Sequence, residues 1–248
     1  MKIRQTNVNL VYPKIDDYRQ KFIKFEDSLK DYFLPANLFT VPDEIQSEVP
    51  RGVAQTKNGH SFLNIALTVS SFSTIYDNEY VGDWSLCEKY IEERCNKVFD
   101  FIERITNEDC YYVGLISNIE YDDFSEDSLQ LMKSVLLKDG ARYLGDLDDV
   151  ACKLTYVINN KYYINITLNN MKRYKIMKTK DGRQLIQNGI GGLIGITLDI
   201  NDRYAANSDE SYRSNKATFK EILDIASTVI YKLPDLITKG VFDANVKK

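Results

Sequence analysis

The only histidine of the chain, His60, is the first residue to consider for catalysis. A Ser-His-Asp or Cys-His device, or a zinc site built on histidine, would have to use it. His60 directly follows Asn58-Gly59, a dipeptide that strongly favours a hairpin turn. An exposed turn is a poor place for a base that must be held in fixed geometry. The sequence therefore disfavours a catalytic role for His60 and leaves the catalytic residues, if there are any, unknown.

A second candidate chemistry is metal binding by carboxylates late in the chain. Asp199 and Asp202 lie at the end of an expected strand, with Asp209 and Glu210 further on, and carboxylates of this kind hold Mg²⁺ in many proteins. In an alternating strand, however, Asp199 points away from the face of Leu198 and Ile200. Exposure to solvent explains it, and we expect neither a metal nor a cofactor.

The glycine-rich segment 188–195 is a third candidate, because glycine-rich loops can cradle phosphate. It lacks the Lys-Ser/Thr ending of a P-loop and leads into a strand, where a dinucleotide-binding fingerprint would lead into a helix. The simpler interpretation is that the glycines permit a bulge or a close approach of strands. Whether the segment from Gly189 to Gly195 binds anything stays open.

A basic segment precedes these glycines. Between Met171 and Arg183 there are six bases and one acid, Asp181. Two interpretations remain: an edge strand protected by lysines, or a docking patch for an acidic partner or RNA. The candidate binding residues, which include one interleaved aromatic, are Lys172, Arg173, Tyr174, Lys175, Lys178, Lys180 and Arg183.

Apolar spacing in the first part of the chain predicts the elements that would position these residues. A strand containing Val8 and Leu10 should be ended by Pro13, and a helix should follow over 16–33. A hairpin should turn at Asn58-Gly59, with its second strand over 63–70, and a helix should extend from Trp84 to Ile105.

The second part of the chain shows a similar series. We expect a central strand over 111–121, a short helix over 125–137, and a hairpin that turns at Asn159-Asn160. A turn at Asp181-Gly182 and a strand over 194–200 should follow, and a last helix over 215–233 should stop before Pro234.

This repeated order predicts an α+β fold made of two similar βαββα-type halves with a mainly antiparallel sheet. The halves would comprise residues 1–109 and 110–248, packed as one unit because there is no long linker between them.

Composition predicts a cytoplasmic protein. The hydrophobic content is 44%, and the beginning of the chain lacks the apolar run of a signal peptide. A net charge of −4 and a pI near 5.2 argue against a protein whose main role is to coat nucleic acid. The four cysteines form no CxxC pair, so we expect reduced thiols.

Two stretches carry a resemblance to a known family. One is Ser47-Glu48-Val49-Pro50-Arg51, followed by a hairpin, Tyr76 and Trp84; the other is 196–200 (ITLDI), followed by a helix ending in 236–238 and by Phe242. Together they resemble a sporadically distributed family of uncharacterised prokaryotic proteins, whose members end in an "LDID" strand, a helix and an "F…IT…" segment. Leu233 and Asn201 depart from that pattern.

This resemblance implies an accessory protein associated with defence-type gene neighbourhoods, with no catalytic residues to carry over. The strand-rich halves also resemble the export chaperone SecB, and a further similarity is to CRISPR repeat-processing endoribonucleases with two ferredoxin-like halves. The single histidine and the acidic pI count against the last of these.

We therefore expect a non-enzymatic protein-interaction or accessory subunit, of a bacterial antiviral defence or toxin–antitoxin-like system. The alternative is an RNA-binding or RNA-processing protein. The strand around Leu63 to Ser71 carries no charge. An uncharged edge or face of this kind is usually paired or buried, so we expect self-association or binding of a protein partner through this strand. No membrane association is expected.

Overall fold

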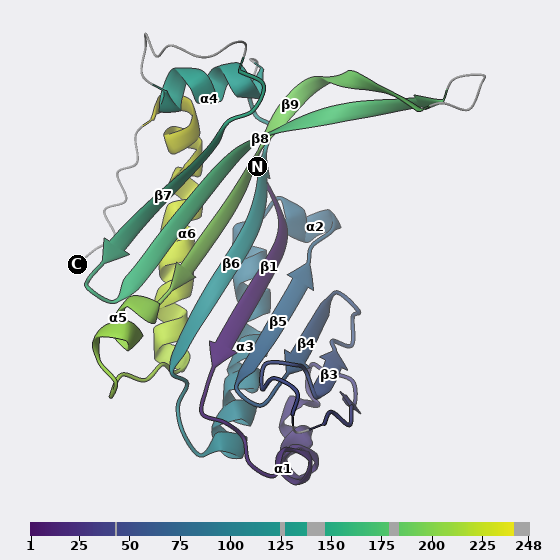
Figure 1. The fold of residues 1–248 in the computed structure, drawn as a ribbon, viewed down its shortest axis with the longest axis vertical. Coiled ribbons are helices and arrows are strands. Elements are labelled where there is room, and N and C mark those ends of the chain that lie inside the picture. Colours follow the sequence, from purple (N-terminus) through teal and green to yellow (C-terminus); the bar gives the residue numbers. More distant parts are fainter. Residues whose placement is uncertain (43, 125–126, 138–146, 179–183, 241–248) are drawn as a thin grey trace.

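The computed structural model describes residues 1–42, 44–124, 127–137, 147–178 and 184–240, and for 173–178 and 184–191 it describes the backbone alone. These residues form an α+β fold with a single antiparallel sheet (Figure 1). The strands are β1 (Lys2–Val11), β2 (Asn37–Leu38), β3 (Gly52–Gln55), β4 (Ser61–Ile65), β5 (Val69–Ile75), β6 (Tyr112–Tyr121), β7 (Ala151–Ile158), β8 (Tyr162–Lys178) and β9 (Gln184–Asn201).

The helices are α1 (Tyr18–Phe25), α2 (Asn78–Val81), α3 (Trp84–Thr106), α4 (Ser128–Leu136), α5 (Arg203–Ser208) and α6 (Lys216–Lys239), and a 3₁₀ turn over Glu26–Leu29 follows α1. The two long helices, α3 and α6, lie side by side behind the sheet in Figure 1. Their buried stripes and one face of the sheet enclose the core.

The strand order is β2-β3-β4-β5-β1-β6-β9-β8-β7, so β1 and β6 pair at the centre. Val8 of β1 faces Leu115 of β6 in the register. Alternation explains the orientation of β1, since Val8 and Leu10 are buried whereas Asn7 and Asn9, which alternate with them, are only partly buried.

Caps fix the ends of the long helices. The Asp83 carboxylate accepts from the Ser85 backbone N–H at 2.8 Å at the start of α3. Asn215 accepts from the Ala217 N–H at 3.0 Å at the start of α6, which ends at Gly240 with φ +66°. Trp84, at the start of α3, donates from Nε1 to Ser227 Oγ of α6 at 2.6 Å. The two helices are therefore held to each other as well as to the sheet.

Both predicted hairpin turns are present. Gly59 has φ +78°, and β3 and β4 pair on either side of it. Asn159 and Asn160 have φ +55° and +49°, the left-handed pair that a tight two-residue hairpin requires, and they join β7 to β8. The expected turn at Asp181-Gly182 lies outside the described residues.

The single strand expected over 63–70 is wrong. The chain reverses after Ile65, the Ala66 N–H donates to the Val69 carbonyl at 2.8 Å, and β4 and β5 pair with each other. Buried and less buried residues alternate along β4, and they alternate again along β5, in which Ser70, Phe72 and Thr74 are buried. Because β4 lies between β3 and β5, and β5 lies between β4 and β1, this uncharged segment is not at an edge of the sheet, and only its faces are open to a partner.

Two helix ends also differ from expectation. The first helix is shorter than predicted, because α1 ends at Phe25 and the chain continues as a 3₁₀ turn. The last helix continues past Pro234 to Lys239. Leu236 and Ile237 beyond the proline are buried, and this burial outweighs the one backbone hydrogen bond that proline cannot make.

The architecture of two βαββα halves is not confirmed. The sheet is continuous, and on the β1 side it has more strands than expected, because β2 is added and the expected strand over 63–70 is divided into β4 and β5. Three of the cysteines, Cys87, Cys95 and Cys110, are buried, Cys152 is partly buried, and all four are free thiols. Among the described helices, none has the length and apolar character that crossing a membrane requires.

Candidate functional site

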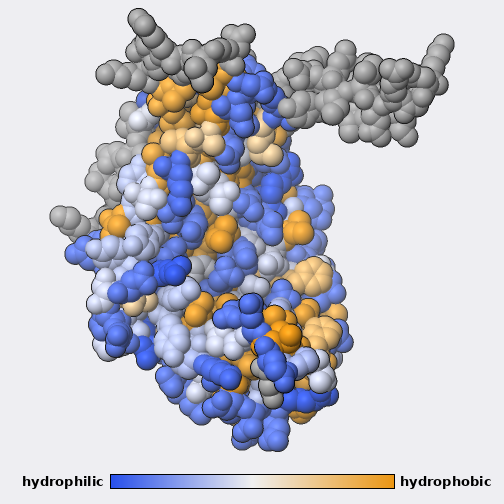
Figure 2. Space-filling view, viewed as in Figure 1, coloured by the Kyte–Doolittle hydropathy of each residue, from blue (hydrophilic) through white to orange (hydrophobic). Residues whose placement is uncertain are grey.

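The long helices leave the opposite face of the sheet uncovered, and this face points toward the viewer in Figures 1 and 2. Its residues align in three cross-strand rows, which we call the open-face rows. The rows are Ile75–Gln5–Asn118–Thr197–Thr167–Lys153, Phe62–Ser73–Asn7–Ile116–Asp199–Asn165–Thr155, and Asn64–Ser71–Asn9–Gly114–Asn201–Tyr163–Val157.

These rows are polar but almost uncharged. Asp199 and Lys153 are their only ionisable residues of the Asp, Glu, Lys and Arg types, and amides and hydroxyls fill most other positions. In the space-filling view this face is largely blue and pale, with separate orange patches (Figure 2). The long helices do not cover it, and α5 meets it at one end, where the Tyr204 ring packs on Tyr163 at 5.3 Å.

The one carboxylate in the middle of the rows is held by amides. Asp199 accepts from Asn201 Nδ2 at 2.9 Å and from Asn165 Nδ2 at 3.2 Å. Asn165 in turn accepts from the Thr155 hydroxyl at 2.8 Å. Asp199 thus lies on the face opposite Leu198 and Ile200, as expected, and its hydrogen bond with Asn165 links β9 to β8, while the Thr155–Asn165 bond links β8 to β7.

Asp202, the other candidate for metal binding, is fully buried. Its carboxylate accepts from the Val113 backbone N–H at 2.8 Å, from the Tyr212 hydroxyl at 2.7 Å and from the Ser214 hydroxyl. Burial raises the pKa of this carboxyl above its ordinary value, and the hydrogen bonds oppose the shift. Asp202 joins β6 to the connection before α6, which is a structural role.

The carboxylates do not assemble into a metal site. In the described part of the chain, no group of three or more His, Cys, Asp or Glu side chains is placed to hold an ion. Asp209 accepts instead from the backbone N–H and the hydroxyl of Ser211, at 2.8 and 2.6 Å.

His60 remains at the hairpin, with Nδ1 3.7 Å from Asp77 Oδ1, and its side chain is 37% exposed. Its backbone N–H donates to Asn58 Oδ1 at 3.4 Å, and its carbonyl accepts from the Ile75 N–H at 3.1 Å. A nucleophile-activating pair is therefore not formed.

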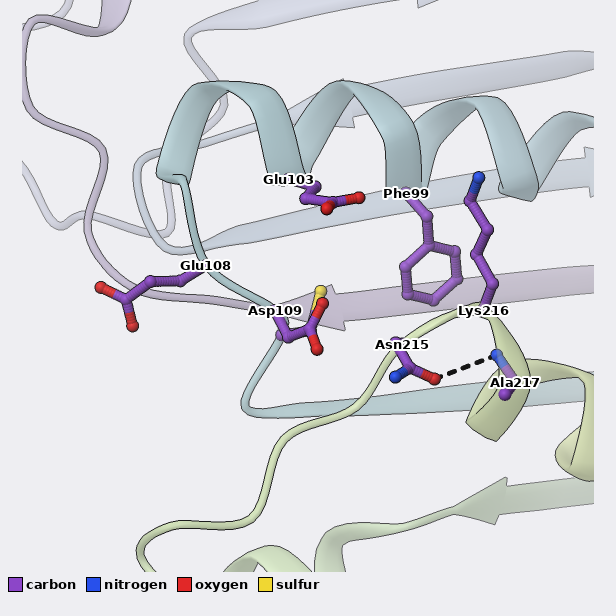
Figure 3. A pocket seen from close by; sticks show the side chains of 8 residues that line it. Phe99, Glu103, Glu108, Asp109, Asn215, Lys216 and Ala217 are labelled. Carbon is purple, nitrogen blue, oxygen red and sulfur yellow. Dashed lines mark hydrogen bonds between the residues drawn. The ribbon is translucent and has the colours of Figure 1, made fainter.

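A cavity of about 340 Å³ lies between the end of α3 and the start of α6 (Figure 3). Its one thiol, Cys110, is buried, and burial raises its pKa, whereas a nucleophilic cysteine needs a lowered pKa. Lys216 is paired with Asp100, and Asn215 is occupied in capping α6. Glu103, Glu108 and Asp109 make the rest of the lining acidic, with no base or nucleophile in position.

The glycines of the 188–195 segment serve close packing where the structure describes them. A Cβ on Gly192 would lie 2.1 Å from Ser128 Oγ of α4, and one on Gly195 would lie 2.5 Å from Met171 Sδ. The ladder between β8 and β9 also shifts register between Lys172 and Tyr174. These observations match the expected bulge and close strand approach.

The basic segment is part of a two-stranded ribbon. Beyond the sheet, β8 and β9 continue to pair as far as Lys178 and Gln184 and project away from the body of the protein (Figure 1). Arg173, Tyr174, Lys175 and Lys178 belong to this ribbon by their backbone, whereas Lys180 and Arg183 lie outside the described residues. Lys172, at its base, pairs with Asp148. Over 171–178, β8 pairs with β9 alone, because its pairing with β7 stops at Asn169, so this part of the strand has one unpaired edge.

Sequence reasoning missed the open-face rows. Their signal was present in the polar residues that alternate with buried ones, such as Asn7 and Asn9 in β1 and Asn165 and Thr167 in β8. Which strands would align these positions into one surface depends on the strand order.

Comparison with known proteins adds no family. No protein-family model matches the chain, and no curated protein matches it.

Proposed function

We propose that this chain is a non-enzymatic interaction protein that binds a protein partner, or a second copy of itself, through the open-face rows. The observation that carries the proposal is the near absence of charge in the open-face rows, which the long helices leave uncovered. Charged residues are depleted and aromatic residues enriched in the cores of protein–protein interfaces, because charges are costly to desolvate. Phe62 and Tyr163 supply exposed or half-exposed rings on this face.

The test introduces a charge at the centre of the face. Asn118 is exposed and lies between Gln5 and Thr197, so an Asn118→Arg variant should keep the fold and place a guanidinium in the interface. Asn96→Arg, the same exchange on α3 in the other layer, is the matched control.

Sedimentation velocity over a wide concentration range and affinity co-purification give the two readouts. The proposal expects a dimer, or one stoichiometric partner, that is kept by Asn96→Arg and lost in Asn118→Arg. A monomer that purifies without a partner, or an association that Asn118→Arg leaves unchanged, would refute it.

The alternative, an RNA-binding or RNA-processing protein, is favoured by the ribbon. At least four bases, Lys172, Arg173, Lys175 and Lys178, lie along a strand that reaches beyond the sheet. Phosphate binding by such residues should weaken steeply with salt. If RNA is retained at low salt, changing Lys172, Arg173 and Lys175 to Glu should abolish the retention; equal retention by the triple variant would exclude the ribbon as the binding element.

The same proposal extends to the biological role of the protein. The resemblance supports a cytoplasmic accessory subunit of a bacterial defence or toxin–antitoxin-like system with SecB-like halves. The strand orders β3-β4-β5-β1 and β7-β8-β9-β6 correspond on the two sides of the central pair, which supports an origin by duplication. The identity of neighbouring genes would test the pathway directly.

A further inference from the structure

One end of the sheet is a long strand that carries almost no charge. The outermost strands are β2, which has two residues, and β7, which has eight and forms the left margin of the sheet in Figure 1. Proteins protect an edge by shortness, proline, a bulge or several charges, because unpaired backbone groups invite another strand. β7 has no proline, its only charged residue is Lys153, and its ladder with β8 has no register shift.

Contacts at the two ends of β7 show which of its backbone groups are used. Val150, just before the strand, donates its N–H to Asn170 Oδ1 at 2.6 Å and accepts from the Asn170 N–H at 3.2 Å. At the other end, the Ile158 carbonyl accepts from the Lys161 N–H at 3.0 Å. In an antiparallel ladder, residues bonded to one neighbour alternate with residues that face the other side. The even-numbered residues of β7 are therefore bonded toward β8.

The odd-numbered residues of β7 direct their N–H and C=O groups away from the sheet. They are Ala151, Lys153, Thr155 and Val157. In the part of the chain that the structure describes, no strand pairs with them on that side. This row of donors and acceptors matches the backbone of one more antiparallel strand.

The two faces of β7 set a second requirement for such a strand. Leu154, Tyr156 and Ile158 are partly buried and pack against the core on the side of the helices. The odd-numbered residues are exposed and belong to the open face. A strand that extends the sheet should therefore be apolar on the helix side and mainly polar on the other.

A second copy of β7 meets both requirements. In an antiparallel pair related by a two-fold axis, residues with outward backbone groups bond to each other, so odd-numbered residues pair with odd-numbered ones. Side chains of one kind then meet on each face. With the axis at Thr155, Leu154 lies opposite Tyr156 of the other copy, and Cys152 lies opposite Ile158.

The single lysine of β7 favours this position of the axis. With the axis at Thr155, Lys153 lies opposite Val157 of the other copy. The two copies of Lys153 are then four residues apart along the strands, roughly 14 Å. An axis at Leu154 would halve that separation and increase the repulsion between the two ammonium groups.

Charges at the two ends of the strand are complementary in the same arrangement. Asp149, an exposed acid just before β7, lies opposite Lys161 of the other copy. Lys161 already donates to Glu221 of its own chain at 2.9 Å. An ammonium has three donors, so it can also donate to Asp149.

We propose that two copies of this chain pair antiparallel along β7, with the two-fold axis at Thr155, and form one continuous sheet. The open-face rows of the two copies would then join into a single surface. The edge is separate from those rows, so the two proposals fail separately. Dimerisation should survive Asn118→Arg, and a partner lost in that variant alone concerns the open face.

Thr155→Pro tests the pairing. Proline removes the outward N–H of Thr155 and keeps the bonds that β7 makes to β8, which is why edge strands tolerate it. Thr155→Ala is the matched control, since both variants lose the hydroxyl that donates to Asn165. In sedimentation velocity, we expect the wild type and Thr155→Ala to dimerise, and Thr155→Pro to bind its copy about tenfold more weakly or less. A monomeric wild type, or a dimer that folded Thr155→Pro leaves unchanged, would overturn the proposal.

If Thr155→Pro does not fold, a cross-link still decides. Ile158→Cys should form a disulfide with Cys152 of the other copy when diamide oxidises the two thiols. The two residues form a non-hydrogen-bonded pair, whose Cα atoms lie about 4.5 Å apart, within disulfide range. Tyr156→Cys, opposite Leu154, is the control.

Non-reducing electrophoresis gives the readout. We expect a covalent dimer in Ile158→Cys that disappears when Cys152 is also changed to Ser, and little in Tyr156→Cys or the wild type. Absence of the dimer in Ile158→Cys, or a stronger one in Tyr156→Cys, would overturn the proposal.

Discussion

At the scale of single residues, Asp202 shows how a carboxylate can organise a fold. It is fully buried and accepts from one backbone N–H and two hydroxyls, on Val113, Tyr212 and Ser214. These groups come from β6 and from the segment before α6. Removing the carboxylate would take this acceptor away from two buried donors, the Val113 N–H and the Ser214 hydroxyl, and from the partly buried Tyr212 hydroxyl.

We expect Asp202→Ala to lower the free energy of unfolding by about 3 kcal/mol, because unsatisfied buried donors carry their full desolvation penalty. Asp202→Asn retains an acceptor for the Val113 N–H, so it should cost less. Urea denaturation monitored by circular dichroism measures both. A loss below about 0.5 kcal/mol for the alanine variant would show that water replaces the carboxylate.

The pH dependence has a definite sign. Because burial raises the pKa of Asp202 in the folded state, the folded protein retains a proton that the unfolded chain releases. Its contribution to stability is full below the unfolded pKa and is lost as pH rises through the raised pKa. The unfolding free energy of the wild type, relative to Asp202→Asn, should therefore fall across that interval. A difference that is constant with pH would contradict the shift.

At the scale of elements, helices and turns were predicted from the sequence better than the positions of single side chains. The stripe from Trp84 to Ile105 and the turn residues Asn58-Gly59 and Asn159-Asn160 determine local structure, and these predictions agree with the structure. The division between β4 and β5 was missed because its turn lacks glycine, proline, asparagine and aspartate, and has the sequence Ala66-Leu67-Thr68. Pro234 likewise predicted the end of the last helix, but the helix continues past it because Leu236 is buried.

The contact between α4 and β9 gives a prediction for elements. Gly192→Ala would place a Cβ 3.3 Å from the Met171 carbonyl and still closer to Ser128 Oγ. We expect a loss of about 1–3 kcal/mol, because strand and helix must separate. Gly82→Ala is the matched control, since no atom lies within 4 Å of its Cβ position. Thermal unfolding compares them, and equal melting temperatures would show that α4 moves freely.

At the scale of the whole molecule, strand order could not be read from the sequence. β1 pairs with both β5 and β6, and these pairings depend on contacts between residues that are far apart in the sequence. Local propensity carries no information about which of these contacts form. The candidate surface was missed for the same reason, because Asn7, Ile116 and Asp199 become neighbours only through that order. The basic segment was found because it is continuous in sequence.

The continuous sheet predicts that the molecule unfolds as one unit. Trp84 is the only tryptophan and donates to Ser227 of α6, so its fluorescence reports contact between the two long helices. We expect its urea transition to coincide with that of the circular dichroism signal. Two separated transitions would show that 1–109 and 110–248 are independent domains.

The central position of β1 has a consequence for the order of events during synthesis. Val11 pairs with Val69, and Lys2 pairs with Glu120, so β1 leaves the ribosome long before either neighbour exists. Its backbone must stay unpaired, or be shielded by other factors, until both partners have been translated. Because such distant pairings slow folding, the nascent chain passes through a long interval in which its future central strand is exposed.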